Sequence, residues 1–180
     1  MVTAGHCWQK MNTPYYYQDG QGRGAHWRFL DRNGQVHYAY AHYSRLLTNT
    51  LTGRAVDTRM FVLSNAMPAA VEPVLWGSPE LVEKAGGLRN MPWFTGSGNK
   101  ELWPQSFTRT NYASWRRGIR GGDSGSGSFV VLDDNLVLVS TFGGNVLEDG
   151  VNWRETAEWL CRKFGHRASI PAEVDLSAYR

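Results

Sequence analysis

Hydrophobic and polar residues alternate along much of the chain, in short runs that are separated by turn residues. Residues 27–30 and 36–40 alternate in this way and flank the turn signal Asp-Arg-Asn-Gly at 31–34. Two alternating runs joined by such a turn predict a β-hairpin. Further strands are expected at residues 60–63, 71–76, 102–109, 128–132 and 136–142. Many short strands with glycine-rich turns are typical of a β-barrel or a β-sandwich.

A helix is predicted near the end of the chain. Apolar residues recur at helical spacing over residues 153–164, at Trp153, Ala157, Leu160, Cys161 and Phe164. Asn152 and Glu155, three residues apart, predict a capping box at the start of this helix, and Gly165 is placed to end it. A second, short helix is expected at residues 78–85.

The composition narrows the class of protein. Of the 180 residues, 42% are hydrophobic, 13% are aromatic and 19% are charged, which excludes intrinsic disorder as the main state. A domain averages roughly 150 residues, so the length suits one large domain or two small ones. The longest apolar runs have four residues, far from the roughly 20 that a membrane-spanning helix needs. We therefore expect no integral helical membrane protein.

Neither the charge nor the cysteine content predicts binding of nucleic acid or zinc, or a disulfide framework. The formal net charge is +3, and the basic residues are scattered except in residues 115–120. We interpret that segment as a solvated loop rather than a nucleic-acid interface. Cys7 and Cys161 are too few for a disulfide framework and lack the spacing of zinc ligands. Cys161 is interpreted as a small core residue of the predicted helix. The first residues lack the layout of a secretory signal, and the localisation stays open.

The segment most indicative of chemistry is Gly-Gly-Asp-Ser-Gly-Ser-Gly at residues 121–127, directly before an apolar strand. Glycines on both sides of Ser124 permit a tight turn and leave its hydroxyl uncrowded. Successive backbone N–H groups in such a turn can converge on one point and stabilise a negative oxygen. Serine needs a base, and a histidine oriented by a carboxylate is the usual solution. His6 follows a short apolar run, and Asp57 precedes a buried-looking strand.

These residues resemble the chymotrypsin-like (trypsin-like) serine proteases. Thr-Ala-Gly-His-Cys at residues 3–7, the aspartate segment at residues 55–63 and Gly-Asp-Ser-Gly at residues 122–125 are similar to the family's three motifs and occur in the family's order. Residues 138–144 are similar to the strand that follows the serine hairpin in the family. The resemblance extends from residue 3 to about residue 165.

The resemblance implies a fold and a function. The fold would be all-β, with two antiparallel β-barrels and a C-terminal α-helix. Residues 1–73 would form the first barrel, which carries His6 and Asp57. Residues 74–164 would form the second barrel, which carries Ser124, and the closing helix, leaving residues 165–180 as a tail. The function would be that of a serine endopeptidase, which hydrolyses a polypeptide substrate and needs no metal or cofactor.

Carried over by motif, His6 would be the general base and then the acid, Asp57 would orient the imidazole, and Ser124 would form the acyl-enzyme. The backbone N–H groups of Gly122 and Ser124 would form the oxyanion hole. The residues that the resemblance assigns to substrate binding are Gly118, Thr141, Phe142 and Gly143. Gly118 stands where trypsin-like members carry an aspartate, so cleavage after basic residues is not expected.

The sequence also departs from the family. The strands that precede the histidine motif are absent, so the first barrel is expected to be incomplete, either because the N-terminus is truncated or because another segment, such as the tail, fills the gap. The Asp57-to-Ser124 spacing is short, as in compact bacterial, phage and viral members. Asp123, which in the family pairs with a new N-terminal amine, has no evident partner.

Two other interpretations compete with this one. The chain could be a catalytically inactive module that keeps the protease fold and binds an extended peptide or protein partner. An activity that depends on Ser124 would separate this alternative from the protease. His37 and His42 invite a metal site, but alternation puts them on opposite faces of a strand and no acidic cluster accompanies them. No metal site is expected.

Overall fold

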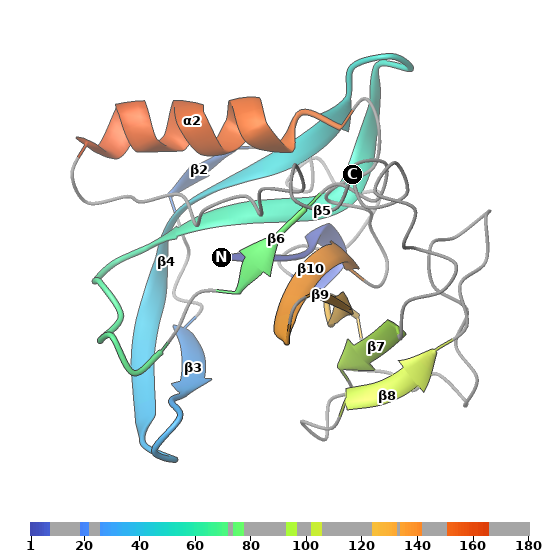
Figure 1. Ribbon diagram of the computed structural model, residues 1–180. Coiled ribbons are helices and arrows are strands. Elements are labelled where there is room, and N and C mark those ends of the chain that lie inside the picture. The colour runs from blue at the N-terminus through green and yellow to red at the C-terminus, as the bar shows by residue number, and fades with distance from the viewer. Residues whose placement is uncertain are drawn as a thin grey trace.

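The computed structural model describes residues 1–7, 19–21, 26–71, 74–77, 93–96, 102–105, 124–132, 134–141 and 151–165. These residues are mostly β-structure with one α-helix near the end of the chain (Figure 1). The strands in the described part of the chain form two five-stranded sheets. No helix among the described residues is long and apolar enough to cross a membrane.

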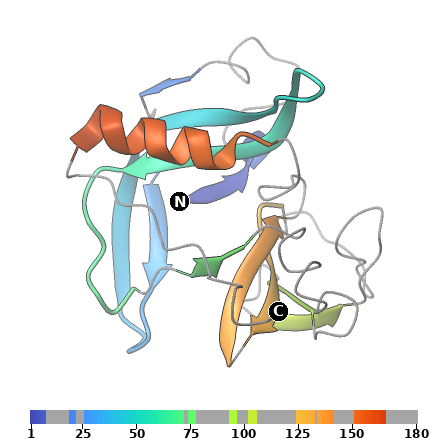
Figure 2. The same ribbon diagram turned by 45° about the horizontal axis from the view of Figure 1, so that its top comes forward.

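The first sheet is antiparallel and contains the first five strands. Its order is β1 (Val2–Ala4), β5 (Arg54–Leu63), β4 (Val36–Asn49) and β2 (Gly20–Gln21), and β3 (His26–Leu30) also pairs with β4. The long strands β4 and β5 bend strongly, so the sheet curls like half of a barrel (Figure 2). Met1 extends the β1–β5 pairing, because its amine donates to the Phe61 carbonyl at 3.0 Å. Burial lowers the pKa of this amine to about 6.

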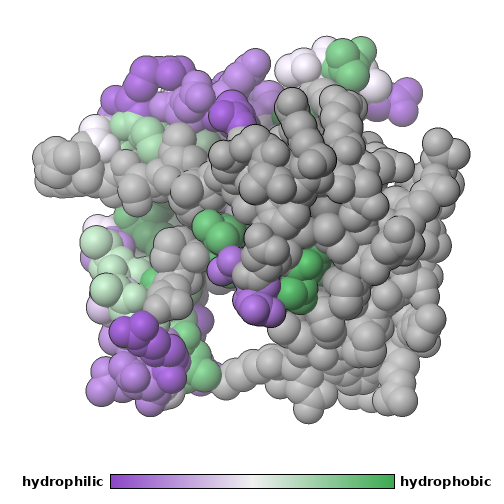
Figure 3. Space-filling model, in the orientation of Figure 1, coloured by the Kyte–Doolittle hydropathy of each residue, from purple (hydrophilic) through white to green (hydrophobic). Residues whose placement is uncertain are grey.

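The β3–β4 hairpin confirms the alternation and turn prediction. One oxygen of the Asp31 carboxylate accepts the N–H groups of Asn33 and Gln35, both at 2.8 Å. The other oxygen lies 2.9 Å from Nε2 of His37, and this hydrogen bond holds the pKa of Asp31 below its usual range. Gly34 completes the turn with a φ of 80°, which glycine adopts without a steric penalty. Polar residues of this hairpin tip gather at the lower left of Figure 3.

Strand β5 is buried on both faces from Thr58 to Val62. One face, with Met60 and Val62, belongs to the main hydrophobic core. On the other face, the ring of Phe61 meets Trp27 of β3 edge to face. Arg59 is fully buried, and its guanidinium donates a 3.0 Å hydrogen bond to the Ser44 hydroxyl of β4.

The second sheet has the order β6 (Leu75–Trp76), β10 (Asn135–Thr141), β9 (Gly127–Leu132), β7 (Trp93–Gly96) and β8 (Leu102–Gln105). β9 and β10, which correspond to the strands expected at residues 128–132 and 136–142, form an antiparallel hairpin, whereas β6 runs parallel to β10. Pro104 lies on β8, the outermost strand of the described sheet, and edge strands are where sheets tolerate proline.

The prediction of a strand over residues 71–76 is only partly right. Among the described residues of that range, only Leu75 and Trp76 are in a strand. Val71 instead donates to the Pro68 carbonyl at 2.9 Å, so its N–H closes a turn and is not available to a sheet. Four expected segments lie wholly or partly outside the described residues: 78–85, 106–109, 142 and the tail from 166.

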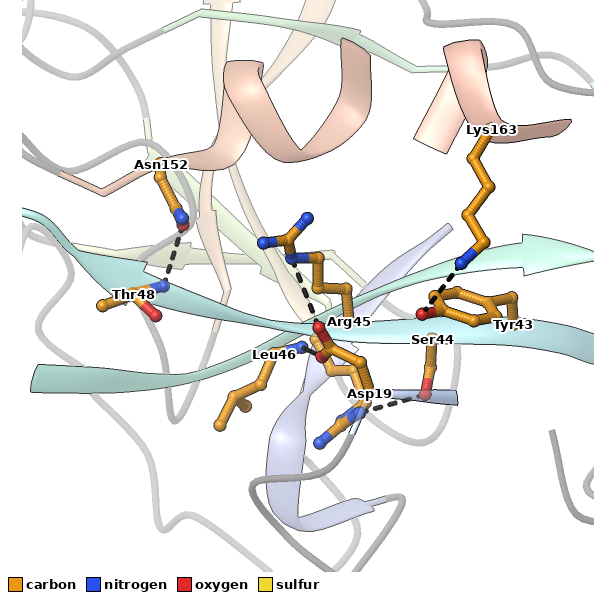
Figure 4. Close-up of polar contacts among 9 residues, drawn as sticks. Asp19, Tyr43, Ser44, Arg45, Leu46, Thr48, Asn152 and Lys163 are labelled. Atoms are coloured by element: carbon orange, nitrogen blue, oxygen red, sulfur yellow. Dashed lines mark hydrogen bonds and ion pairs between the residues drawn. The ribbon is translucent and has the colours of Figure 1, made fainter. Parts of the chain in front are cut away.

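The helix α2 (Trp153–Phe164) has the predicted bounds, and Gly165 follows it with a φ of 62°. The predicted capping box is wrong, because the Asn152 side chain makes no cap hydrogen bond. Its Oδ1 instead accepts the Thr48 N–H at 2.8 Å, and its own N–H donates to the Thr48 carbonyl (Figure 4). The residue before the helix therefore fastens it to β4.

Helix α2 packs across β4 and β5 of the first sheet (Figure 2). Lys163 donates to the Tyr43 hydroxyl at 3.4 Å and lies 4.4 Å from the centroid of that ring (Figure 4). Arg45 lies over the Trp159 ring at 4.4 Å and pairs with Asp19 at 3.4 Å. The charged residues of α2 otherwise face outward, along the top of Figure 3.

One hydrophobic core joins the helix to both sheets. Its buried members are Leu47, Met60, Val62, Trp76, Val151, Trp153, Ala157 and Leu160. Trp76 of the second sheet packs edge to face against Trp153 of the helix. Among the described strands, each sheet runs in an open order. The all-β class with a C-terminal helix is confirmed, and the described strands form a curled half-barrel and a second sheet.

Candidate active site

The pairing of β1 with β5 brings His6 to Asp57. Ala4 pairs with Thr58, so the chain that leaves β1 passes Asp57 as it forms the short 3-10 helix η1 (Gly5–Cys7). Asp57 lies within β5 rather than before it. Its Oδ1 accepts the backbone N–H of His6 at 2.9 Å, and its Oδ2 lies 2.5 Å from Nδ1 of the same residue.

This double contact fixes the imidazole. A carboxylate only accepts hydrogen bonds, so Nδ1 of a neutral His6 carries the proton that it shares with Asp57. Nε2 is then without a proton and can accept one. The Asp57 side chain is 17% exposed and that of His6 is 33% exposed. The carboxylate is therefore largely shielded, whereas the ring remains accessible from solvent.

Ser124 lies in the turn that leads into β9, 117 residues along the chain from Cys7. The turn nevertheless contacts the His6 segment, because the Cys7 thiol donates to the Ser124 carbonyl at 3.5 Å. The next residue, Gly125, has a φ of 82°. A Cβ at this position would clash with the Thr3 hydroxyl and lie 2.8 Å from the Ala4 nitrogen. The structure thus brings all three predicted catalytic residues into one region.

Two separate constraints, one on backbone conformation and one on space, require glycine at position 125. Its positive φ disfavours any L side chain, and its close approach to β1 leaves no room for a Cβ. The sequence pattern indicates only that this glycine leaves the serine uncrowded. The structure adds that it lets two backbone segments, one before His6 and one after Ser124, lie directly against each other.

The remaining predicted residues are placed only in part. Thr141 ends β10, where it is buried and pairs with Gly127 of β9. It therefore lies one strand away from the turn that carries Ser124. Gly122, Gly118, Phe142 and Gly143 lie outside the described residues, as does Asp123. The oxyanion hole and the substrate strand thus stay predictions.

Two features of the site are missed by sequence reasoning. Thr3 and Cys7 are recognised only as parts of the histidine motif, and no pattern indicates that they contact the serine turn. The buried charge of Arg59, two residues after Asp57, is also missed. Within an alternating strand, an arginine at that position looks like a solvent-facing residue, and only the packing of Trp27 and Phe61 on the same face reveals otherwise.

No family model, curated protein or solved structure matches the chain. The described residues also contain no group of three or more His, Cys, Asp or Glu side chains that could hold a metal ion. A shielded carboxylate, an imidazole with an accepting nitrogen and a serine in a glycine-rich turn are the components of nucleophilic acyl transfer.

Proposed function

We propose that the chain is a serine endopeptidase of the chymotrypsin-like type, with His6, Asp57 and Ser124 as its catalytic triad. The observation that carries this proposal is the double contact of Asp57 with His6, at 2.9 Å and 2.5 Å, beside the turn of Ser124. That contact fixes the tautomer and the orientation that a general base requires. The order of the three residues along the chain agrees with the family motifs.

In the proposed reaction, Nε2 of His6 removes the proton of the Ser124 hydroxyl as its oxygen attacks a peptide carbonyl. The N–H groups of Gly122 and Ser124 stabilise the oxygen that becomes negative. His6 then returns the proton to the leaving amine, and an acyl-enzyme remains on Ser124. Water hydrolyses this ester by the same proton transfers. The substrate is a polypeptide that lies along Thr141, Phe142 and Gly143, and the reaction needs no metal or cofactor.

The alternative is an inactive module that only binds an extended peptide, and the His6 geometry favours the enzyme. Withdrawing the Asp57 carboxylate from water is unfavourable unless its charge is compensated. A module that grips peptides along β10 would gain nothing from compensating it with an imidazole on another sheet. A general base gains its tautomer and orientation from this arrangement.

The test is labelling of the folded chain by a fluorophosphonate, which reacts with activated serines. We expect the wild-type chain to be labelled, and labelling to be lost in Ser124→Ala and after heat denaturation. Ser126→Ala is the matched control, because Ser126 lies in the same glycine-rich segment, and it should be labelled like wild type. A folded wild-type chain that takes no label, or a Ser124→Ala variant that still takes it, would contradict the proposal.

Asp57→Asn tests the assigned role of the carboxylate. An amide in place of the carboxylate can donate to Nδ1, which places the proton of His6 on the wrong nitrogen. We expect the labelling rate to fall by roughly 10⁴-fold, the loss typical of this change in a Ser-His-Asp triad. An unchanged rate in a folded Asp57→Asn chain would show that Asp57 has no part in activating the serine.

A further inference from the structure

The Cys7 thiol contacts the backbone of the proposed nucleophile. Cys7 directly follows His6, and its thiol donates to the carbonyl of Ser124 at 3.5 Å. The hydrogen bond thus joins the neighbour of the base to the backbone of the nucleophile. The two residues are 117 positions apart in the chain. Cys7 follows β1 of the first sheet, and Ser124 precedes β9 of the second.

The thiol is suited to act as a donor. Cys7 is exposed, but partial desolvation of its sulfur raises the pKa of the thiol above its ordinary value. A hydrogen bond with Thr3 opposes this effect, and the Coulombic effect of Asp57 adds to it. The sulfur therefore keeps its proton at neutral pH. A thiolate in this place would repel the Ser124 carbonyl, whereas the thiol donates to it. Both cysteines of the chain are free thiols, so no disulfide competes for the sulfur.

The second contact of the serine turn is made by Gly125. Its Cα lies so close to Thr3 and Ala4 that no Cβ fits. The Ser124 carbonyl oxygen and the Gly125 Cα belong to the same peptide group, which is planar. Two points of one plane are thus held by the β1–η1 segment. The same plane contains the Cα of Ser124, so holding it fixes the point at which the Ser124 side chain leaves the backbone.

We propose that Cys7 is a positioning residue for the nucleophile: its thiol holds the Ser124–Gly125 peptide plane so that the Ser124 hydroxyl stays within reach of His6. This inference rests on the proposed function. Cys7 does not touch the substrate carbonyl in this scheme and exchanges no proton with it. Its effect reaches the reaction only through the geometry of Ser124, and a misplaced nucleophile slows attack even when the base is intact.

The experiment compares rates of labelling by a fluorophosphonate. Each rate is divided by the fraction of the protein that is labelled at the end of the reaction, so that it refers to labelling-competent molecules only. Cys7→Ala removes the donor, and we expect the rate to fall about fivefold, which corresponds to roughly 1 kcal/mol of activation free energy. Cys7→Ser keeps a donor, and its rate should stay within about twofold of wild type. Cys161→Ala, on α2, is the matched control for loss of a thiol and should be labelled at the wild-type rate.

Two further readouts separate positioning from a merely structural role. Loss of a structural contact lowers the thermal midpoint and the labelled fraction, but not the rate of each folded molecule. The pH midpoint of labelling reports the His6–Asp57 pair, which these variants leave in place. We therefore expect Cys7→Ala to lower the maximal labelling rate in the pH profile without moving the pH at which that rate is half-maximal.

Equal normalised rates for wild type and Cys7→Ala would overturn this inference and leave the proposed protease intact. A Cys7→Ser rate as low as that of Cys7→Ala would also overturn it, because the donor would then be irrelevant. A shifted pH midpoint would show that Cys7 acts through the base instead. A folded wild-type chain without labelling would overturn the proposed function and this inference together.

Discussion

At the scale of single residues, the candidate site depends on close approach of backbone as much as on catalytic side chains. Gly125 and Gly53 both have a positive φ, of 82° and 67°. Gly53 lies in the turn between β4 and β5, where a Cβ would meet no atom within 4 Å, whereas Gly125 lies against Thr3 and Ala4. The two glycines therefore separate the effect of backbone strain from the effect of lost space.

We expect Gly125→Ala to abolish fluorophosphonate labelling and Gly53→Ala to preserve it. Both substitutions impose strain of about 1 kcal/mol at a positive φ, so both should lower the thermal midpoint by a few degrees. Only Gly125→Ala must also push the serine turn away from β1. Differential scanning calorimetry and labelling of the same samples measure both effects. Labelling of a folded Gly125→Ala chain at the wild-type rate would contradict this account of the turn.

The residues proposed as catalytic could be singled out from the sequence, because each lies in a short contiguous motif. The contacts that assemble them could not. The Cys7–Ser124 hydrogen bond and the packing of Gly125 on Thr3 each join positions more than 100 residues apart, and no local pattern encodes such a distance. The burial of Arg59 is hidden for the same reason, since it follows from what covers β5.

At the scale of elements, the features that depend on local sequence patterns could be predicted. The lengths of strands, which depend on pairing with other strands, could not. The β3–β4 hairpin and the bounds of α2 follow from turn residues and helical periodicity. The extension of β4 to Asn49 and the shortness of β6 depend on partner strands and on competing turn bonds. The hairpin turn and the start of the helix each offer a test of this difference.

Asp31 should determine the stability of the β3–β4 hairpin. Asp31→Ala leaves the N–H groups of Asn33 and Gln35 and the His37 ring without their acceptor, so we expect the thermal midpoint to fall by roughly 5 °C. Asp31→Asn keeps one acceptor oxygen for the two N–H groups, so its thermal midpoint should fall by less. A fall as large in Asp31→Asn as in Asp31→Ala would show that the charge, and not the turn bonds, is decisive.

The same residue predicts a pH dependence. The hydrogen bond from His37 lowers the pKa of Asp31 in the folded state, so the folded chain binds fewer protons than the unfolded chain in acid. The contribution of Asp31 is present above its unfolded pKa and is lost as the pH falls through its folded pKa. Urea midpoints measured from pH 5 down to pH 2 should converge for wild type and Asp31→Asn. A constant difference between the two urea midpoints over this pH range would show that protonation of Asp31 is not coupled to folding.

The start of α2 distinguishes the capping box expected from sequence from the contact found in the structure. Asn152→Ala removes the acceptor of the Thr48 N–H, and we expect it to lower the free energy of unfolding by about 1 kcal/mol. Glu155 is exposed, so Glu155→Ala should change it by less than about 0.5 kcal/mol. Chemical denaturation of the two variants measures both. A capping box would instead give both variants a similar loss.

At the scale of the whole molecule, the candidate site draws on both sheets. His6 directly follows β1 and Asp57 lies in β5, both strands of the first sheet, and the Ser124 turn leads into the second. The core that includes Trp76 of the second sheet and Trp153 of α2 lies between them. A site divided in this way works only if the two sheets stay in a fixed relation, and the shared core supplies that relation.

The shared core predicts that the two sheets unfold together. Trp153→Ala removes a large buried side chain from the contact with Trp76, and we expect it to lower the free energy of unfolding by about 3–5 kcal/mol. Hydrogen exchange of the backbone amides of β5 and β10 should then accelerate by the same factor, because one opening event exposes both strands. Glu158→Ala, on the outward side of α2, should leave both rates unchanged. Acceleration of β5 alone would show that the sheets are independent units, and the geometry of the site would then have to be maintained by the β1 and Ser124 contacts without help from the core.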